Sequence, residues 1–167
     1  MSKFDLIVIG SGPSGEKAAI QAAKLGKSVL VVDKREALGG NCLHTGTIPS
    51  KTLRESVRFI ELMRNRSVYG ISVQLDKDLT VNRLMHRKNA AVTSLAERVE
   101  SSFDRNDVEH FQGTARFLDA HRVEVTEEDG SRDTYETECA VIATGSRPYR
   151  PEIVNFNQDR VRDSDTI

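Results

Sequence analysis

The sequence predicts an α/β fold built on a parallel β-sheet, and three observations support it. Residues 6–9 and 29–32 form two short, wholly apolar runs. Between them, residues 16–25 are rich in alanine and other helix formers, and Gly26 follows where a helix C-terminus favours glycine. Continuous apolar strands joined by a helix are typical of a parallel sheet buried on both faces. We therefore expect a right-handed β-α-β unit at the start of the chain.

Two amphipathic helices are expected next, as an insertion beside the sheet. Apolar residues recur at helical spacing from Leu53 to Met63 and again from Leu84 to Phe103. The stretch 69–78 between them reads as a loop with a short extended piece. This places a helical insertion at about residues 50–107.

Short strands follow the insertion and end in a longer apolar run. Strand-like stretches at 108–112, 114–118, 122–127 and 133–136, with a hairpin turn at Asp129, predict a small antiparallel β-meander. We place that meander at about residues 108–137. The apolar run 139–143 is expected to return to the main sheet.

Composition excludes several classes of function. The 167 residues, 38% of them hydrophobic, suffice for one domain with a core. The 24 basic and 25 acidic residues nearly cancel, with no long run of one sign, so we expect small-molecule partners rather than nucleic acid or membrane. The first apolar run is too short for a signal peptide, so a cytoplasmic location is expected. Cys42 and Cys139 form neither a disulfide framework nor a metal-ligand set, and no metal is expected.

The glycine pattern of residues 10–15 carries the first functional signal. It is a G-x-G-x-x-G directly after a predicted strand and at the start of a helix. There Gly12 lets the backbone approach a pyrophosphate, which the N-H groups and positive dipole end of the helix attract. Asp33, 18 residues after Gly15, ends the second strand and can bind ribose hydroxyls. This arrangement predicts a Rossmann-like dinucleotide site and leaves FAD and NAD(P) both open.

The segment 39–51 closely resembles the active-site segment of the flavin-dependent pyridine nucleotide-disulfide oxidoreductases. The matching residues are the double glycine, Cys42, Gly46 and the run 48–51. This resemblance implies FAD as cofactor, with the segment lying against its isoalloxazine ring. It also implies that the chain is the FAD-binding part of a larger two-dinucleotide-binding fold, without the NAD(P) and dimerisation domains.

Thr47 stands where that family has its second redox cysteine. A dithiol relay needs two sulfur atoms within bonding distance. Cys139 lies in a separate predicted strand, so disulfide, lipoamide or mercuric ion reduction by the usual relay is disfavoured. Hydride exchange between nicotinamides needs no disulfide.

The cysteine-threonine pattern resembles the transhydrogenase branch of the family, as do residues 113–117, 143–148 and 162–167. This implies that the full-length enzyme is a homo-oligomer that passes hydride from NADPH through FAD to NAD+, and that the present chain alone is inactive. Two alternatives stay open. One is another NAD(P)H-dependent flavin reductase with a different acceptor, and the other is a non-catalytic nucleotide-binding module.

The resemblance also implies roles for individual residues. Lys51 would lie near flavin N5 and stabilise charge on the reduced ring, unless it is an exposed lysine of the first helical turn. Cys42 would lie over the flavin face, either as a weak electron donor or as a small buried residue. His44 is expected to be a surface or hydrogen-bonding histidine. The candidate cofactor-binding residues are Gly10, Gly12, Pro13, Ser14, Gly15, Asp33, Lys34, Gly40, Asn41, Cys42, Thr47, Lys51, Gly113, Thr114, Ala115, Ala143, Thr144 and Gly145.

Overall fold

The computed structural model of the protein describes residues 2–64, 70, 81–157, 160–163 and 165. Its elements, in chain order, are β1 (Lys3–Ile9), α1 (Pro13–Lys24), β2 (Val29–Asp33), α2 (Gly40–His44), α3 (Thr47–Arg64), α4 (Val81–Asp104), β3 (Glu109–Gln112), β4 (Thr114–Phe117), β5 (Arg122–Thr126) and β6 (Arg132–Ile142). The α/β prediction is confirmed. The loop predicted at 69–78 lies outside the described residues, apart from Gly70.

One six-stranded sheet organises the fold, in the order β3-β2-β1-β6-β5-β4. β1 pairs in parallel with β2 on one side and with β6 on the other, so Leu6 lies opposite both Val29 and Cys139. The helix between β1 and β2 is α1, as expected. The chain therefore leaves β1 towards β2 and returns to its other side at β6. This reversal of strand order opens a crevice at the carboxyl ends of the two strands.

β3 differs from the expected meander. It pairs in parallel with β2 from Leu30 opposite Glu109 to Asp33 opposite Gln112, so it extends the parallel part of the sheet. Only β4, β5 and β6 form antiparallel pairs. The expected meander at about 108–137 thus begins at β4. The pattern of exposed and apolar residues in a four-residue edge strand does not specify its partner or direction.

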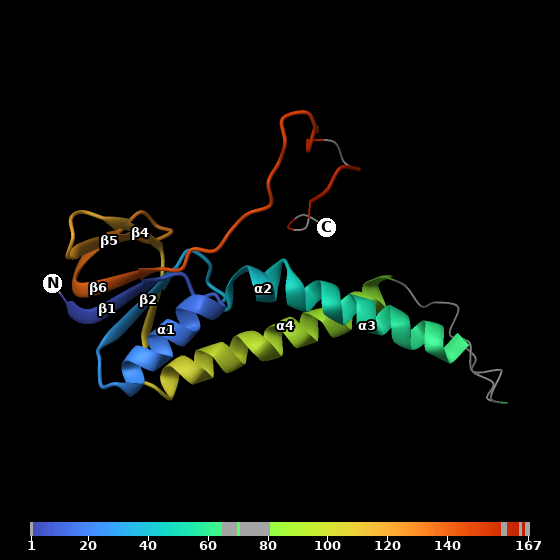
Figure 1. The fold of residues 1–167 in the computed structure, drawn as a ribbon, viewed down its shortest axis with the longest axis horizontal. Helices are drawn as coiled ribbons and strands as arrows, with labels where there is room; N and C mark the ends of the chain where they lie inside the picture. The colour runs from blue at the N-terminus through green and yellow to red at the C-terminus, as the bar shows by residue number, and fades with distance from the viewer. Residues whose placement is uncertain (1, 65–69, 71–80, 158–159, 164, 166–167) are drawn as a thin grey trace.

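The sheet is strongly curved, so that its two edge strands, β3 and β4, come close together. Gly113 alone joins β3 to β4, although these strands stand at opposite ends of the sheet order. Its backbone N-H donates to the carbonyl oxygen of Asp33 at 2.8 Å. Across the curved sheet, the rings of Phe111 and Tyr135 have centroids 6.2 Å apart. In Figure 1 the β4-β5 hairpin covers one face of the parallel strands, and α1 and α4 lie against the other.

Two apolar cores follow from this arrangement, because successive side chains of a strand point to opposite faces. On the concave side of the curved sheet, Leu30 and Val32 of β2 are buried with members of β1, β5 and β6. On the helical face, Val29 and Val31 are buried with Ala19 of α1 and with the C-terminal part of α4. Because β2 is covered by an apolar layer on each face, its side chains are apolar on both faces.

Three elements depart from the predictions. β6 is one strand of 11 residues, where strands at 133–136 and 139–143 were expected. Its first part pairs with β5 and its second part with β1, and Glu136 pairs with both strands. The short helix α2 was not predicted, and α3 begins at Thr47, before the start of the helical insertion expected at about residue 50.

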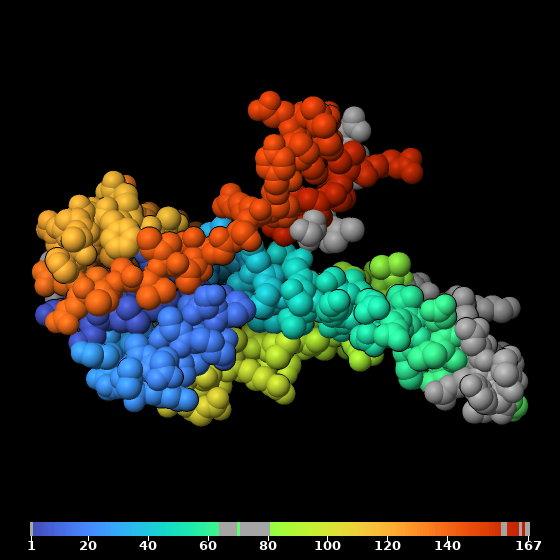
Figure 2. Space-filling view, in the orientation of Figure 1, coloured from blue at the N-terminus to red at the C-terminus, as the bar shows by residue number. Residues whose placement is uncertain are grey.

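The helices α3 and α4 form a hairpin that extends beyond the sheet (Figure 1). Figure 2 shows α3, in teal to green, and the yellow-green N-terminal part of α4 projecting from the body of the domain. Val57, Phe59 and Leu62 of α3 are more than half exposed. After β6 the chain has no regular structure among the described residues and turns away from the sheet.

Candidate functional site

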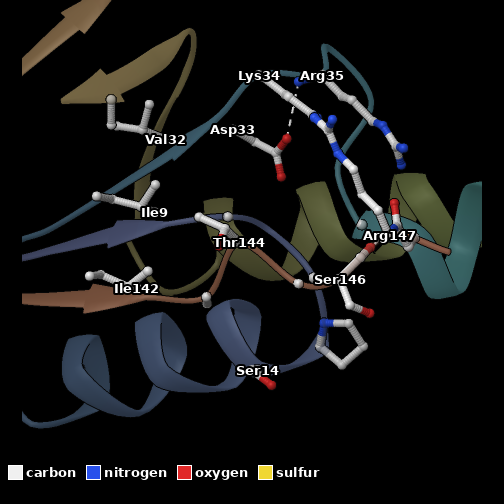
Figure 3. Close-up of a pocket in the computed structure, with 18 of the residues that line it drawn as sticks. Ile9, Ser14, Val32, Asp33, Lys34, Arg35, Ile142, Thr144, Ser146 and Arg147 are labelled. Atoms are coloured by element: carbon white, nitrogen blue, oxygen red, sulfur yellow. Dashed lines mark hydrogen bonds between the residues drawn. The ribbon is translucent and has the colours of Figure 1, made fainter. Parts of the chain in front are cut away.

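A cavity of about 840 Å3 lies at the carboxyl ends of the parallel strands. It is lined by Ile9 of β1, Val32 and Asp33 of β2 and Ile142 of β6. Figure 3 shows Ile9, Val32 and Ile142 in a row across the three strands. This is the crevice produced by the reversal of strand order, where open α/β sheets bind their ligands. Its volume is within the range of small-molecule and cofactor sites.

The start of α1 forms one wall of the cavity, through Gly12, Pro13 and Ser14. No side chain caps this helix N-terminus. A Cβ atom at Gly12 would have only Gly40 Cα within 4 Å, at 3.9 Å, so the backbone here is open to the cavity. Uncapped N-H groups at a helix start form a site for an anion such as a pyrophosphate.

Gly10 and Gly15 hold this wall close to β1. Gly10 has a φ of +109°, a value that side-chain-bearing residues rarely adopt. A Cβ atom at Gly15 would collide with the carbonyl oxygen of Gly10 and lie 3.2 Å from Val8 Cγ1. Gly15, a predicted cofactor-binding residue, does not line the cavity and instead allows the close contact between α1 and β1.

Asp33 is fixed beside the glycine loop. Its Oδ2 accepts hydrogen bonds from the backbone N-H and the hydroxyl of Ser11, at 2.7 and 2.6 Å. Its Oδ1 accepts one from the backbone N-H of Arg35 at 3.0 Å. The carboxylate at the end of β2 thus borders the cavity in a defined orientation.

The segment that begins α2 also lines the cavity, through Gly40, Asn41 and Cys42, and it adjoins the start of α1 where Gly40 lies against Gly12. Asn41 Nδ2 donates to the carbonyl oxygen of Ser146 at 2.6 Å, which ties α2 to the chain after β6. Cys42 Sγ approaches the carbonyl oxygen of Gly39 at 3.7 Å. Burial, and to a smaller extent the charge of Glu16, raises the pKa of the Cys42 thiol.

Most of the predicted cofactor-binding residues are brought together here, although they lie far apart in the sequence. Those that line the cavity are Gly10, Gly12, Pro13, Ser14, Asp33, Lys34, Gly40, Asn41, Cys42, Gly113, Thr114, Ala115, Ala143, Thr144 and Gly145. Thr47 and Lys51 do not line it. Both lie near the start of α3, and Lys51 is exposed there.

Several lining residues were missed by the sequence analysis. They are Ile9, Val32, Arg35, Ile142, Ser146, Arg147 and Asp165. Figure 3 shows Lys34, Arg35 and Arg147 gathered on the same side of the pocket as Asp33. The terminal nitrogen Nη1 of Arg35 is buried without a hydrogen-bond partner among the residues that the structure describes. Arg147 lies within the segment 143–148 that carried the resemblance, so position in that motif could have indicated it.

His44 makes the hydrogen bond expected of it. Its Nε2 lies 2.8 Å from the carbonyl oxygen of Leu38, outside the residues that line the cavity. Among the described residues no group of three or more histidine, cysteine, aspartate or glutamate side chains could hold a metal ion. No helix within the residues that the structure describes is long and apolar enough to cross a membrane.

Comparison with known proteins agrees with this geometry. The family described as pyridine nucleotide-disulphide oxidoreductase matches residues 4–167. A soluble pyridine nucleotide transhydrogenase of Mycobacterium tuberculosis is 44% identical over 168 residues, which is 100% of this chain and 36% of that protein. Proteins with the same name from Vibrio vulnificus and Colwellia psychrerythraea are 44% and 42% identical over 98% of the chain.

The chain spans about a third of the length of these curated relatives. The match nevertheless covers both the glycine loop and the cavity that the structure builds around it. The chain therefore belongs to the pyridine nucleotide-disulphide oxidoreductase family.

Proposed function

We propose that the cavity binds FAD, with its pyrophosphate at the start of α1 and its adenosine beside Asp33. The observation that carries this proposal is the convergence of an uncapped helix N-terminus and a fixed carboxylate at one crevice. The helix N-terminus is suited to a pyrophosphate, and the carboxylate is suited to the hydroxyls of a ribose. The flavin end of the dinucleotide would then lie towards Asn41 and Cys42, beyond the contact of Gly40 with Gly12.

For the protein as a whole, we propose pyridine nucleotide transhydrogenase activity, the activity that the names of its relatives give. In this proposal FAD is the carrier through which hydride passes from NADPH to NAD+. When bound, FAD supplies the hydride-accepting ring. The described residues bind and orient it. Thr47 fits an exchange that needs no second thiol, and the raised pKa keeps Cys42 in its neutral form at pH 7.

Lys51 remains a proposed partner of the reduced flavin ring. Its place on the exposed side of α3, near the segment that bears Cys42, is compatible with contact to a ligand that extends beyond the cavity. A cation there would stabilise negative charge on the ring. Replacement by methionine keeps the length of the side chain and tests the charge alone.

The decisive experiment measures flavin uptake and turnover with the full-length protein that contains this chain. Apoprotein is incubated with FAD, reduced with NADPH and then mixed with NAD+ while the absorbance of the oxidised flavin is followed. Reoxidation by NAD+ supports the transhydrogenase proposal. Reoxidation by a quinone or dye, but not by NAD+, supports another flavin reductase. No flavin uptake supports a non-catalytic nucleotide-binding module.

We further propose that the protein acts in the cytoplasm as a homo-oligomer. The exposed Val57, Phe59 and Leu62 on the helical hairpin are compatible with a covered surface. Light scattering of the purified protein measures its mass in solution, and a monomeric mass contradicts the oligomer.

A further inference from the structure

Ser11 occupies most of the hydrogen-bonding capacity of Asp33. An ionised carboxylate offers about four acceptor positions, two on each oxygen. Ser11 donates twice to Oδ2, at 2.7 and 2.6 Å, and the backbone N-H of Arg35 donates once to Oδ1, at 3.0 Å. Figure 3 draws the Arg35 bond at the edge of the cavity. Among the described residues, these three donors leave one acceptor position, and it is on Oδ1.

The direction of the Ser11 hydroxyl proton is fixed by a third residue. The backbone N-H of Gly39 donates to Ser11 Oγ at 3.1 Å. A hydroxyl carries a single proton, so Ser11 Oγ accepts from Gly39 and gives its own proton to Asp33. Ser11 is fully buried, with 0% of its surface exposed, so bulk water does not compete for either bond. The pairing of Ser11 with Asp33 is therefore part of the preformed site.

A ribose presents two neighbouring hydroxyls, and a carboxylate holds both only when each of its oxygens has a free acceptor position. Asp33 lacks that position on Oδ2. We propose that Ser11 is a specificity-determining residue that restricts Asp33 to one ribose hydroxyl of the bound adenosine. The inference rests on the proposed FAD site. It makes Ser11 a positioning residue, because it acts through Asp33.

The chain contains a matched control for this pairing. At the other end of the β1-β2 pair, the backbone N-H and hydroxyl of Ser28 donate to Asp5 Oδ2 at 2.8 and 2.9 Å. Ser28 and Asp5 do not line the cavity. Ser28→Ala thus removes the same kind of bond from the same two strands without touching the site.

The test uses apoprotein, FAD and two FAD analogues, one with 2′-deoxyadenosine and one with 3′-deoxyadenosine. Quenching of flavin fluorescence gives the dissociation constant of each. With the unaltered protein, one analogue is expected to bind about 10- to 100-fold more weakly than FAD, because it lacks a hydrogen bond to a charged group. The other is expected to bind within about twofold of FAD, since its missing hydroxyl has no acceptor on Asp33.

The variant Ser11→Ala frees an acceptor position on Asp33 Oδ2. In this variant, the dissociation constants of the two FAD analogues are expected to differ by less than about threefold. Ser28→Ala is expected to keep the difference seen with the unaltered protein. A purely structural role for Ser11 would weaken FAD and both analogues equally and leave their ratio unchanged, which overturns the inference.

The dissociation constants measured with the unaltered protein test the inference even if Ser11→Ala does not fold. Equal loss of affinity for the two analogues, or no loss for either, overturns the role of Ser11 while FAD binding stands. Failure of FAD itself to bind contradicts the proposed function instead.

Discussion

Asn41 of α2 donates a hydrogen bond from Nδ2 to the backbone carbonyl oxygen of Ser146, at 2.6 Å, across 105 positions of sequence. This bond joins the part of the cavity lining that bears Cys42 to the chain after β6, which also lines the cavity. Because the Asn41 amide bridges two segments that line the cavity, loss of this hydrogen bond is expected to loosen both segments.

Asn41→Ala is expected to weaken FAD binding about 2- to 10-fold, the equivalent of one hydrogen bond of about 0.5–1.5 kcal/mol. Fluorescence titration of the apoprotein measures the change. Asn106→Ala is the control, because Asn106 Nδ2 also donates to a backbone carbonyl, that of Ser102 at 2.7 Å, but outside the cavity. Equal loss of FAD affinity in the two variants would contradict the bridging role of Asn41.

Gly40→Ala is expected to disturb the approach of α2 to the glycine loop. Gly40 has a φ of +66°, and a Cβ atom there would lie 2.7 Å from Gly12 Cα. We expect a loss of stability of about 2–4 kcal/mol and at least a tenfold loss of FAD affinity. Denaturant unfolding and FAD titration measure the two effects.

Gly130→Ala separates backbone strain from crowding in that experiment. Gly130 has a φ of +88° with nothing within 4 Å of an added Cβ atom. It should cost about 1–2 kcal/mol, with FAD affinity unchanged. A similar loss of FAD affinity in both glycine variants would show that crowding against Gly12 is not the cause.

Cys42 is expected to react slowly with iodoacetamide at pH 7, because burial raises its pKa and only the thiolate attacks. Cys139 is exposed on β6 and should be alkylated first. Peptide mass spectrometry over time resolves the two sites. FAD added before the reagent should slow Cys42 alone, since Cys42 lines the cavity. Protection of both cysteines, or of neither, would argue against FAD lying next to Cys42.

Cys42→Ser tests whether hydride exchange uses the thiol. Hydride passes between nicotinamide and flavin without any sulfur, so we expect at least about a tenth of the rate of NADPH-dependent NAD+ reduction to remain. Full loss of turnover with normal FAD content would assign the thiol a direct role.

Asp5 makes the stability of the β1-β2 pair dependent on pH. Hydrogen bonds from Ser28 and Lys27 lower the pKa of Asp5 from 3.8 to about 2. A pKa that is lower in the folded state adds stability above the unfolded value, and that stability is lost as pH falls from 3.8 towards 2. The melting temperature of Asp5→Asn should therefore be lower than that of the unaltered protein at pH 5, and the two melting temperatures should approach each other near pH 2. A difference that stays constant across this range would rule out ionised Asp5 as its source.

The local part of the fold could be predicted from the sequence, because its causes are local. The apolar runs of β1 and β2, the glycines of the loop and the acid at the end of β2 are each specified by neighbouring residues. Asp33 could be named as a site residue because a Rossmann-like unit places the end of β2 beside the start of α1. The segment 39–51 added the cofactor through its resemblance to a family.

The contacts between distant segments were decided by tertiary structure. The direction of β3, the continuous β6 and the entry of Arg147 into the cavity depend on how strongly the sheet curves, which no single segment encodes. Ser11 shows the same limit, because the sequence marks it only as a variable position of the glycine motif. Its two bonds to Asp33 exist because β1 and β2 pair in a register that ends both strands at the same edge of the sheet.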